Sequence, residues 1–223
     1  LYRNSPSSFI DVLIISDDIC QRFAAKIFEE FNSFPGMRNV FVVEKNGPEF
    51  LRLHVFDWSS VWEYHSALYL DSDCIVIRPL DSLLNFSLTD GIIYAKHENL
   101  NAKYYRVSPY SREQLNEFQK RRIRNFNSGV LLFLVGNKMK TAFHDIRLFV
   151  QDLQKRKAQF FTDQAPINTY FNSRFASDTF LLESSVRLWS TKHENDTALI
   201  LHAQGKGFGS LEAKIKIMKN LQS

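Results

Sequence analysis

The chain has 223 residues, of which 44% are hydrophobic and 23% charged, a composition typical of one α/β domain or, less readily, two small ones. A formal net charge of +4 fits a protein that binds anions such as phosphates, and it is too small to indicate nucleic acid. The two cysteines, Cys20 and Cys74, lack motif spacing and argue against a disulfide framework and against a zinc site. No apolar segment reaches the roughly 18 residues of a membrane span.

The first third of the sequence predicts strands that alternate with helices. Apolar runs and their periodicity indicate a strand at 9–16, a helix at 18–34, a strand at 38–45, and a helix or helix-turn at 49–67. The run ALYLDSDCIVI at 67–77 then predicts a strand that leads directly into Asp71 and Asp73.

The remaining sequence continues the alternation. Strands are expected at 91–97, 126–135 and the start of 198–210, and helices at 140–156 and 161–171. The segment 98–124 is predicted to be a functional loop with some helix, and 211–223 a basic tail. This order predicts a single α/β domain over 1–223, with a mostly parallel sheet covered by helices on both faces. Ligands of such sheets bind at the carboxyl ends of strands.

Three side chains at predicted strand ends are candidate metal ligands. Asp71 and Asp73 are two residues apart, so both carboxylates can reach one divalent cation, and oxygen ligands suit Mg²⁺ or Mn²⁺. A charged strand end that makes turn hydrogen bonds is the alternative, which the flanking apolar runs disfavour. His202 follows the apolar run ALIL and could reach the same crevice, although taken alone it is better explained as a structural histidine.

Further polar residues are candidates for holding a ligand. Asn127 carries an amide that can bond hydroxyl groups in both senses, and Gly205 and Lys206 follow His202 in a glycine-rich loop suited to an anion. Asp163 and Gln164 stand at a predicted helix start, where capping by Thr162 or Asp163 is the simpler explanation.

The blocks LYLDSDCIVI, FNSGVLLF, TDQAPIN and LILHAQGKG occur in this order and resemble the signature blocks of family-8 retaining glycosyltransferases, the glycogenin-like group with the GT-A fold. The stretch FLRLHVFDW is similar to the Lys/Arg-Leu block that precedes the metal motif in that family. The resemblance implies an enzyme that moves a hexose from a nucleotide sugar, most readily a UDP-sugar, to a hydroxyl of a glycan, protein or lipid-linked acceptor.

The resemblance also implies roles for individual residues. Asp71, Asp73 and His202 would bind Mn²⁺, with Mg²⁺ as the alternative ion. Gln164 would lie by the anomeric carbon and act with Asp163 in catalysis. The donor would be held by a further set, Arg52, Asn127, Ser128, Gly205 and Lys206.

The sequence departs from the family pattern in two places. Phe208 stands where the loop after the histidine has a lysine, and the family's first strand and most of its first helix have no counterpart, so we expect that an upstream segment is missing from this sequence. Both departures leave open a catalytically impaired protein that binds a nucleotide sugar or glycan.

The reaction class and the cellular setting each have a competing interpretation. A phosphohydrolase of the haloacid-dehalogenase type also uses Asp-x-Asp, but on its first strand. A nucleic-acid partner is not expected. The donor sugar, the acceptor and the choice between monomer and homodimer stay open, and the cytoplasm is favoured over the secretory lumen.

Overall fold

The computed structural model describes residues 11–17, 21, 26, 38–43, 48–98, 111, 113, 116–117, 120–121, 124–156, 163–174, 176–188 and 198–202. Several expectations lie outside the described residues. These are the loop with Gly205 and Lys206, the tail at 211–223, most of the helix at 18–34 and most of the segment 98–124.

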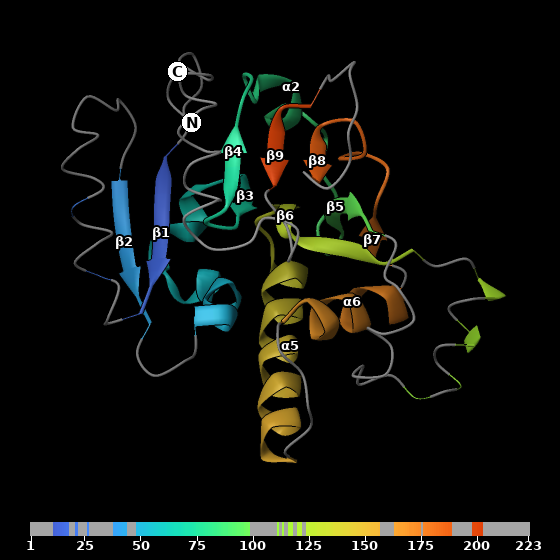
Figure 1. Cartoon of the computed structure of the whole chain (residues 1–223). Coiled ribbons are helices and arrows are strands. Elements are labelled where there is room, and N and C mark those ends of the chain that lie inside the picture. The colour runs from blue at the N-terminus through green and yellow to red at the C-terminus, as the bar shows by residue number, and fades with distance from the viewer. Residues whose placement is uncertain are drawn as a thin grey trace.

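The described strands form three sheets (Figure 1). A two-stranded sheet contains β1 (Val12–Ser16) and β2 (Arg38–Val42). A four-stranded sheet has the order β3 (Ser66–Leu70), β6 (Phe126–Leu134), β5 (Ile93–His97) and β7 (Ser177–Asp178). A three-stranded sheet has the order β4 (Cys74–Val76), β9 (Ile200–His202) and β8 (Val186–Leu188).

The pairing of these strands is mixed, which corrects the expectation of a mostly parallel sheet. The pairs β1–β2, β5–β7 and β8–β9 are parallel, whereas β3–β6, β5–β6 and β4–β9 are antiparallel. The main cause is the central strand β6, which runs against both of its neighbours. Alternation of strands and helices in a sequence does not reveal such a reversal, because strand direction is set by tertiary pairing.

The run at 67–77 forms two strands where one was predicted. β3 ends at Leu70, and the backbone then turns, with the Cys74 amide donating to the Asp71 carbonyl at 3.0 Å. β4 begins at Cys74 and pairs with β9 in a different sheet. The two aspartates therefore occupy the turn where the chain passes from one sheet to the next.

The described helices at 48–63, 137–155 and 164–173 lie where helices were expected, and they differ from the expectation in type or in their ends. The segment predicted as a helix or helix-turn at 49–67 contains two 3₁₀ helices, η2 (Pro48–Asp57) and η3 (Ser59–Glu63). The two predicted helices of the second half are α5 (Asn137–Lys155) and α6 (Gln164–Ser173), and a four-residue helix, α2 (Asp81–Leu84), was not predicted. None of the helices in the described part of the chain has the length and apolar character that a membrane crossing needs.

Two hydrophobic cores lie on opposite faces of β6. Leu131 and Phe133 pack with α5, α6 and η2, in a core that includes Phe143 and Phe171. The alternate residue Val130 packs with Leu132 against α2, β8 and β9. Because successive side chains of a strand point to opposite faces, a strand covered on both sides is apolar at successive positions, as residues 130–134 of β6 are.

The antiparallel course of β6 also positions its polar beginning. Phe126 pairs with His97 at the end of β5, and Val130 pairs with Leu70 at the end of β3. The segment FNSG at 126–129 lies within the strand, in agreement with the strand expected at 126–135. The start of β6 thus lies beside the carboxyl ends of β3 and β5, where Asp71 follows.

Candidate active site

The three predicted metal ligands come together in the structure. The Nε2 atom of His202 lies 3.1 Å from Oδ1 of Asp73 and 3.7 Å from Oδ2 of Asp71. His202 is buried, whereas both aspartates are partly exposed. Two carboxylates and an imidazole from β9 and the β3–β4 turn therefore face one another, as the sequence predicted.

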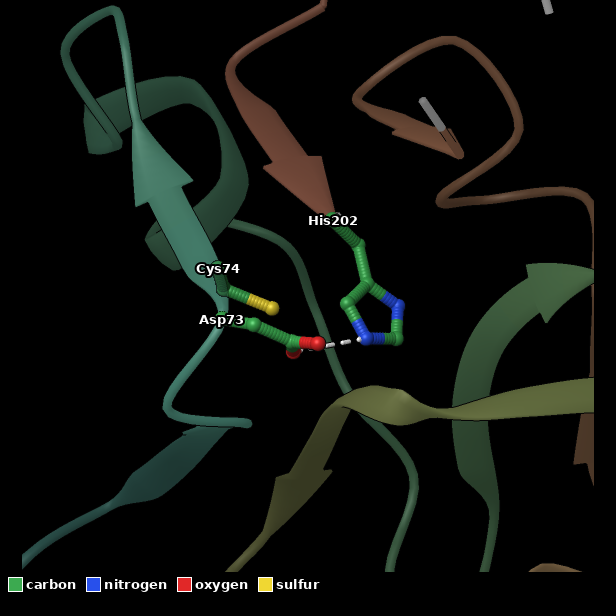
Figure 2. Close-up of side chains that lie close together, drawn as sticks. All are labelled: Asp73, Cys74 and His202. Atoms are coloured by element: carbon green, nitrogen blue, oxygen red, sulfur yellow. Dashed lines mark ion pairs between the residues drawn. The ribbon is translucent and has the colours of Figure 1, made fainter. Parts of the chain in front are cut away.

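A fourth side chain, Cys74, joins this group. Its Sγ, a carboxylate oxygen of Asp73 and a ring nitrogen of His202 all lie within 4.8 Å of one another (Figure 2). Sequence reasoning set Cys74 aside because it has no motif spacing. The signal that could have found it was its position directly after Asp73, at the start of an apolar run.

The imidazole fits only because residue 129 is glycine. A Cβ atom on Gly129 would lie 2.1 Å from Cε1 of His202, much closer than side-chain atoms approach. The carbonyl of Gly129 also accepts a hydrogen bond of 2.8 Å from the backbone amide of Asp71. The small residue in the block FNSG thus leaves room for the imidazole of His202, a predicted metal ligand.

Asp71 is oriented by two neighbours on the η2 side of the sheet. The hydroxyl of Tyr69 donates to its Oδ1 at 2.5 Å, and Nη2 of Arg52 lies 3.1 Å from the same oxygen. Burial, reinforced by the charge of Asp71 although opposed by that of Arg52, raises the pKa of Tyr69, so the phenol keeps its proton and remains a donor. The other oxygen, Oδ2, is the one that faces His202.

Arg52 connects this group to the start of α6. Its Nε lies 2.8 Å from Oδ2 of Asp163, its Nη1 donates to the carbonyl of Ser128, and its guanidinium lies 4.4 Å from the ring centroid of Tyr69. Burial alone would lower the pKa of Arg52, but the surrounding acidic groups, Asp163 foremost, raise it, so the guanidinium stays charged.

Asp163 does not cap α6. It occupies the N-cap position, but its side chain makes no capping hydrogen bond among the described residues and pairs with Arg52 instead. Burial raises the pKa of Asp163 to about 7, although the charge of Arg52 partly offsets that rise. The simpler explanation, that Asp163 caps the helix, is therefore wrong. The other candidate cap, Thr162, lies outside the described residues.

Gln164 belongs to a buried amide cluster. Its Nε2 donates to Oε2 of Glu98 at 2.9 Å, and its Oε1 accepts from the backbone amide and the hydroxyl of Ser128, both at 3.4 Å. Asn127 donates to the same Glu98 oxygen at 3.3 Å, while its Oδ1 accepts from the Gly129 amide at 2.8 Å.

Glu98 and Asn168 were missed by sequence reasoning. Glu98 follows β5 at the same sheet edge as the other candidates, and that position was the signal that could have found it. Asn168 lies on α6, where its side chain accepts from the Phe126 amide at 2.9 Å and donates to the Phe126 carbonyl at 2.8 Å. These two bonds attach α6 to the start of β6, and no sequence pattern indicates them.

The site therefore has two chemically different ends. One end contains the carboxylates of Asp71 and Asp73 and an imidazole, which suit a divalent cation. The other contains amides, the Ser128 hydroxyl and the carboxylates of Glu98 and Asp163, which suit a polyhydroxyl ligand. Arg52 pairs with Asp71 at the first end and with Asp163 at the second.

Solved structures with a similar fold are glycosyltransferases of low sequence identity. The apo structure of the bifunctional glycosyltransferase WbbM has a TM-score of 0.64 and 15% identity, over 98% of this chain and 45% of that one. The apo form of GlyE from Streptococcus pneumoniae TIGR4 has a TM-score of 0.58 and 18% identity, over 96% and 52%. Galactosyltransferase LgtC, in complex with donor and acceptor sugar analogues, has a TM-score of 0.58 and 14% identity, over 96% and 95%.

These likenesses confirm the GT-A fold class of the single α/β domain. The chain spans about half the length of the WbbM and GlyE chains it matches. No curated protein matches the sequence.

A family comparison extends beyond the fold. The sequence model described as glycosyl transferase family 8 matches residues 23–202, which contain Asp71, Asp73, Gln164 and His202. The match covers well over half of the chain, so this chain belongs to glycosyltransferase family 8.

Proposed function

We propose that the protein is a metal-dependent retaining glycosyltransferase that moves a hexose from a UDP-sugar to a hydroxyl acceptor. The observation that carries this proposal is the convergence of Asp71, Asp73 and His202 beside the buried cluster around Gln164. The LgtC structure with donor and acceptor sugar analogues supports it, because that protein has the same fold.

The ligand atoms of Asp71, Asp73 and His202 fit Mn²⁺, and Mg²⁺ is the alternative ion. Two carboxylates and an imidazole suit a first-row divalent cation, and Oδ2 of Asp71 and Oδ1 of Asp73 both face Nε2 of His202. Bound there, such a cation supplies positive charge that stabilises the diphosphate as a leaving group. Gly205 and Lys206 are proposed to contact the same diphosphate.

The amide end of the site is proposed to hold the hexose. Asn127, Ser128 and Asp163 would bind sugar hydroxyls, and Gln164 would place its amide by the anomeric carbon. Gln164 donates to Glu98 and accepts from Ser128, so its side chain is held in one orientation. A fixed dipole of this kind can stabilise an oxocarbenium-like state on the face that the diphosphate leaves, which is what retention requires.

Arg52 is proposed to act by positioning the donor-binding groups. Its nitrogens already contact Asp71, Asp163 and the Ser128 carbonyl, so the guanidinium fixes the two ends of the site relative to each other. This assignment refines the expectation that Arg52 contacts the donor itself.

A panel of UDP-sugars tests the proposal and names the donor. We expect Mn²⁺-dependent hydrolysis or transfer with at least one UDP-sugar in the full-length protein, and its loss in Asp73→Ala. Asp152→Ala, a change on α5, should leave turnover unchanged. Equal turnover in Asp73→Ala and wild type would refute the metal assignment, and binding of UDP-sugars without turnover would favour the catalytically impaired protein.

The role of Gln164 is tested separately. We expect Gln164→Ala to lower kcat far more than it weakens UDP binding, because the amide is proposed to act on the reacting carbon. Gln151→Ala, on the exposed face of α5, is the matched control. Equal losses in kcat and in UDP affinity would leave Gln164 a binding residue only.

A further inference from the structure

Cys74 faces His202 because of the strand register. In the antiparallel pair β4–β9, Cys74 lies directly opposite His202. Side chains of directly opposed residues project from the same face of a sheet, with Cβ atoms roughly 4.5–5.5 Å apart. The thiol and the imidazole are therefore held together by a backbone ladder, and the carboxylate of the preceding residue, Asp73, completes the group within 4.8 Å (Figure 2).

The thiol makes a weak hydrogen bond within the described part of the chain. Its Sγ lies 3.5 Å from the carbonyl of Gly129, a long contact for a weak donor. The sulfur lies beside the carboxylate of Asp73 and the imidazole of His202, which directs attention to its capacity as a ligand.

The imidazole is able to present a lone pair to the same point. The Nδ1 atom of His202 is buried and has no hydrogen-bond partner among the described residues. The ring can therefore carry its proton on Nδ1 while Nε2, the atom that faces Asp73, binds a cation.

We propose that Asp73, Cys74 and His202 form a binding site for thiophilic cations of the Zn²⁺ and Cd²⁺ class, and that such a cation excludes Mn²⁺. On binding, the Cys74 thiol loses its proton to solvent and the thiolate sulfur, the imidazole nitrogen and a carboxylate oxygen become ligands. Three protein ligands with a fourth position for water make a common zinc arrangement.

The choice of cation follows from ligand chemistry. Soft thiolates favour Zn²⁺ and similar ions, whereas Mn²⁺ prefers oxygen and nitrogen ligands. Cys74 therefore adds affinity for thiophilic cations without adding affinity for Mn²⁺. Because Asp73 and His202 serve both ions, occupancy by one prevents occupancy by the other. The exclusion of Mn²⁺ rests on the proposed function, but the binding of thiophilic cations does not.

A cadmium titration tests the site without reference to activity. Thiolate–cadmium bonds give an ultraviolet charge-transfer band, which is followed in the full-length protein without thiol reductant. We expect the band in wild type and in Cys20→Ser, which removes the other cysteine of the sequence, and no band in Cys74→Ser or Cys74→Ala. A band that persists in both Cys74 variants, or that appears in no protein, overturns the proposal. Circular dichroism verifies that each variant is folded.

Inhibition by Zn²⁺ in the presence of Mn²⁺ tests the second claim, that a thiophilic cation excludes Mn²⁺ from the site. We expect the half-inhibitory Zn²⁺ concentration to rise by at least about tenfold in Cys74→Ser, the loss typical of weakening a metal site by one group. Equal inhibition of wild type and Cys74→Ser would overturn the competition. A cadmium band in a protein without transferase activity would refute the proposed function alone, and normal activity without a band would refute this inference alone.

Discussion

The two carboxylate oxygens of Asp71 have different neighbours. Oδ1 is held by Tyr69 and Arg52, and Oδ2 faces His202. Outer partners of this kind fix the orientation of a metal ligand and are often as important as the ligand itself. The sequence indicated Asp71 as a ligand, but not which oxygen can reach a cation, because that depends on Arg52, which comes from a separate helix.

Replacing Tyr69 by Phe should weaken Mn²⁺ binding by about tenfold or more, because Asp71 loses a hydrogen bond that orients it. Electron paramagnetic resonance of free Mn²⁺ during a titration measures the affinity. Tyr170→Phe is the matched control, since that phenol donates to Asp145 between α6 and α5. Unchanged affinity in Tyr69→Phe would show that Arg52 alone suffices.

Asp163 should make stability depend on pH. Its pKa is raised from 3.8 to about 7 by burial, so the folded state holds the proton more tightly than the unfolded state does. The stability that its protonated form contributes is present below about pH 4 and is lost as the pH rises towards 7.

We therefore expect Asp163→Asn to show a smaller loss of unfolding free energy than wild type between these two pH values. Urea denaturation in steps of pH measures the difference, with Asp152→Asn on α5 as the control. Parallel pH profiles for wild type and Asp163→Asn would contradict the expected shift.

At the level of elements, β6 determines where the site forms. Its apolar part is buried between two cores, and its first residues lie beside the ends of β3 and β5. The sequence predicted this strand, because FNSGVLLFL ends in a continuous apolar run of five residues, VLLFL. It did not predict β7 and β8, which have two and three residues and are too short to show any periodicity.

Replacing Gly129 by Ala should disturb this junction. The added Cβ would lie 2.1 Å from the His202 ring, so the imidazole or β6 must move. We expect weaker Mn²⁺ binding and a loss of about 1–3 kcal/mol in unfolding free energy, as for other overpacked cores. Metal titration and urea denaturation measure the two effects.

The control for this change is Gly136→Ala. Its Cβ would lie 2.4 Å from the Asp90 carboxylate, which accepts hydrogen bonds from the Lys138 and Met139 amides at the start of α5. We expect lower stability with normal Mn²⁺ affinity. Wild-type metal affinity in Gly129→Ala would contradict the steric role of that glycine.

For the whole molecule, the sequence predicted the α/β class and the family, and the comparisons confirm both. The resemblance to the family also implied that Asp71, Asp73 and His202 share one site, and the structure brings the three side chains together. The sequence did not predict the sheet pairing or the contacts of Arg52, Tyr69 and Cys74. Those depend on how separate sheets are placed against one another, which local patterns do not encode.

Addition of Mn²⁺ with UDP should stabilise the folded protein as a whole. A ligand at about 100 times its Kd adds about 2.7 kcal/mol to the free energy of unfolding. For a chain of this length we expect Tm to rise by roughly 5 °C or more. Excess EDTA should reverse the shift, and Asp73→Ala should show none. A similar shift in Asp73→Ala would place the UDP–metal complex elsewhere.

The small sheet β4–β9–β8 has a consequence for folding. In this sheet β4, at residues 74–76, pairs with β9, at residues 200–202, so we expect the sheet to close after most of the chain has collapsed. Contacts between residues this distant in sequence form slowly, because a long loop must close first. The contacts between α5 and α6 and the pairing of β5 with β6 join residues that are closer in sequence than those paired by β4 and β9. We therefore expect refolding molecules to acquire their cation-binding capacity in the last kinetic phase, after most secondary structure is in place.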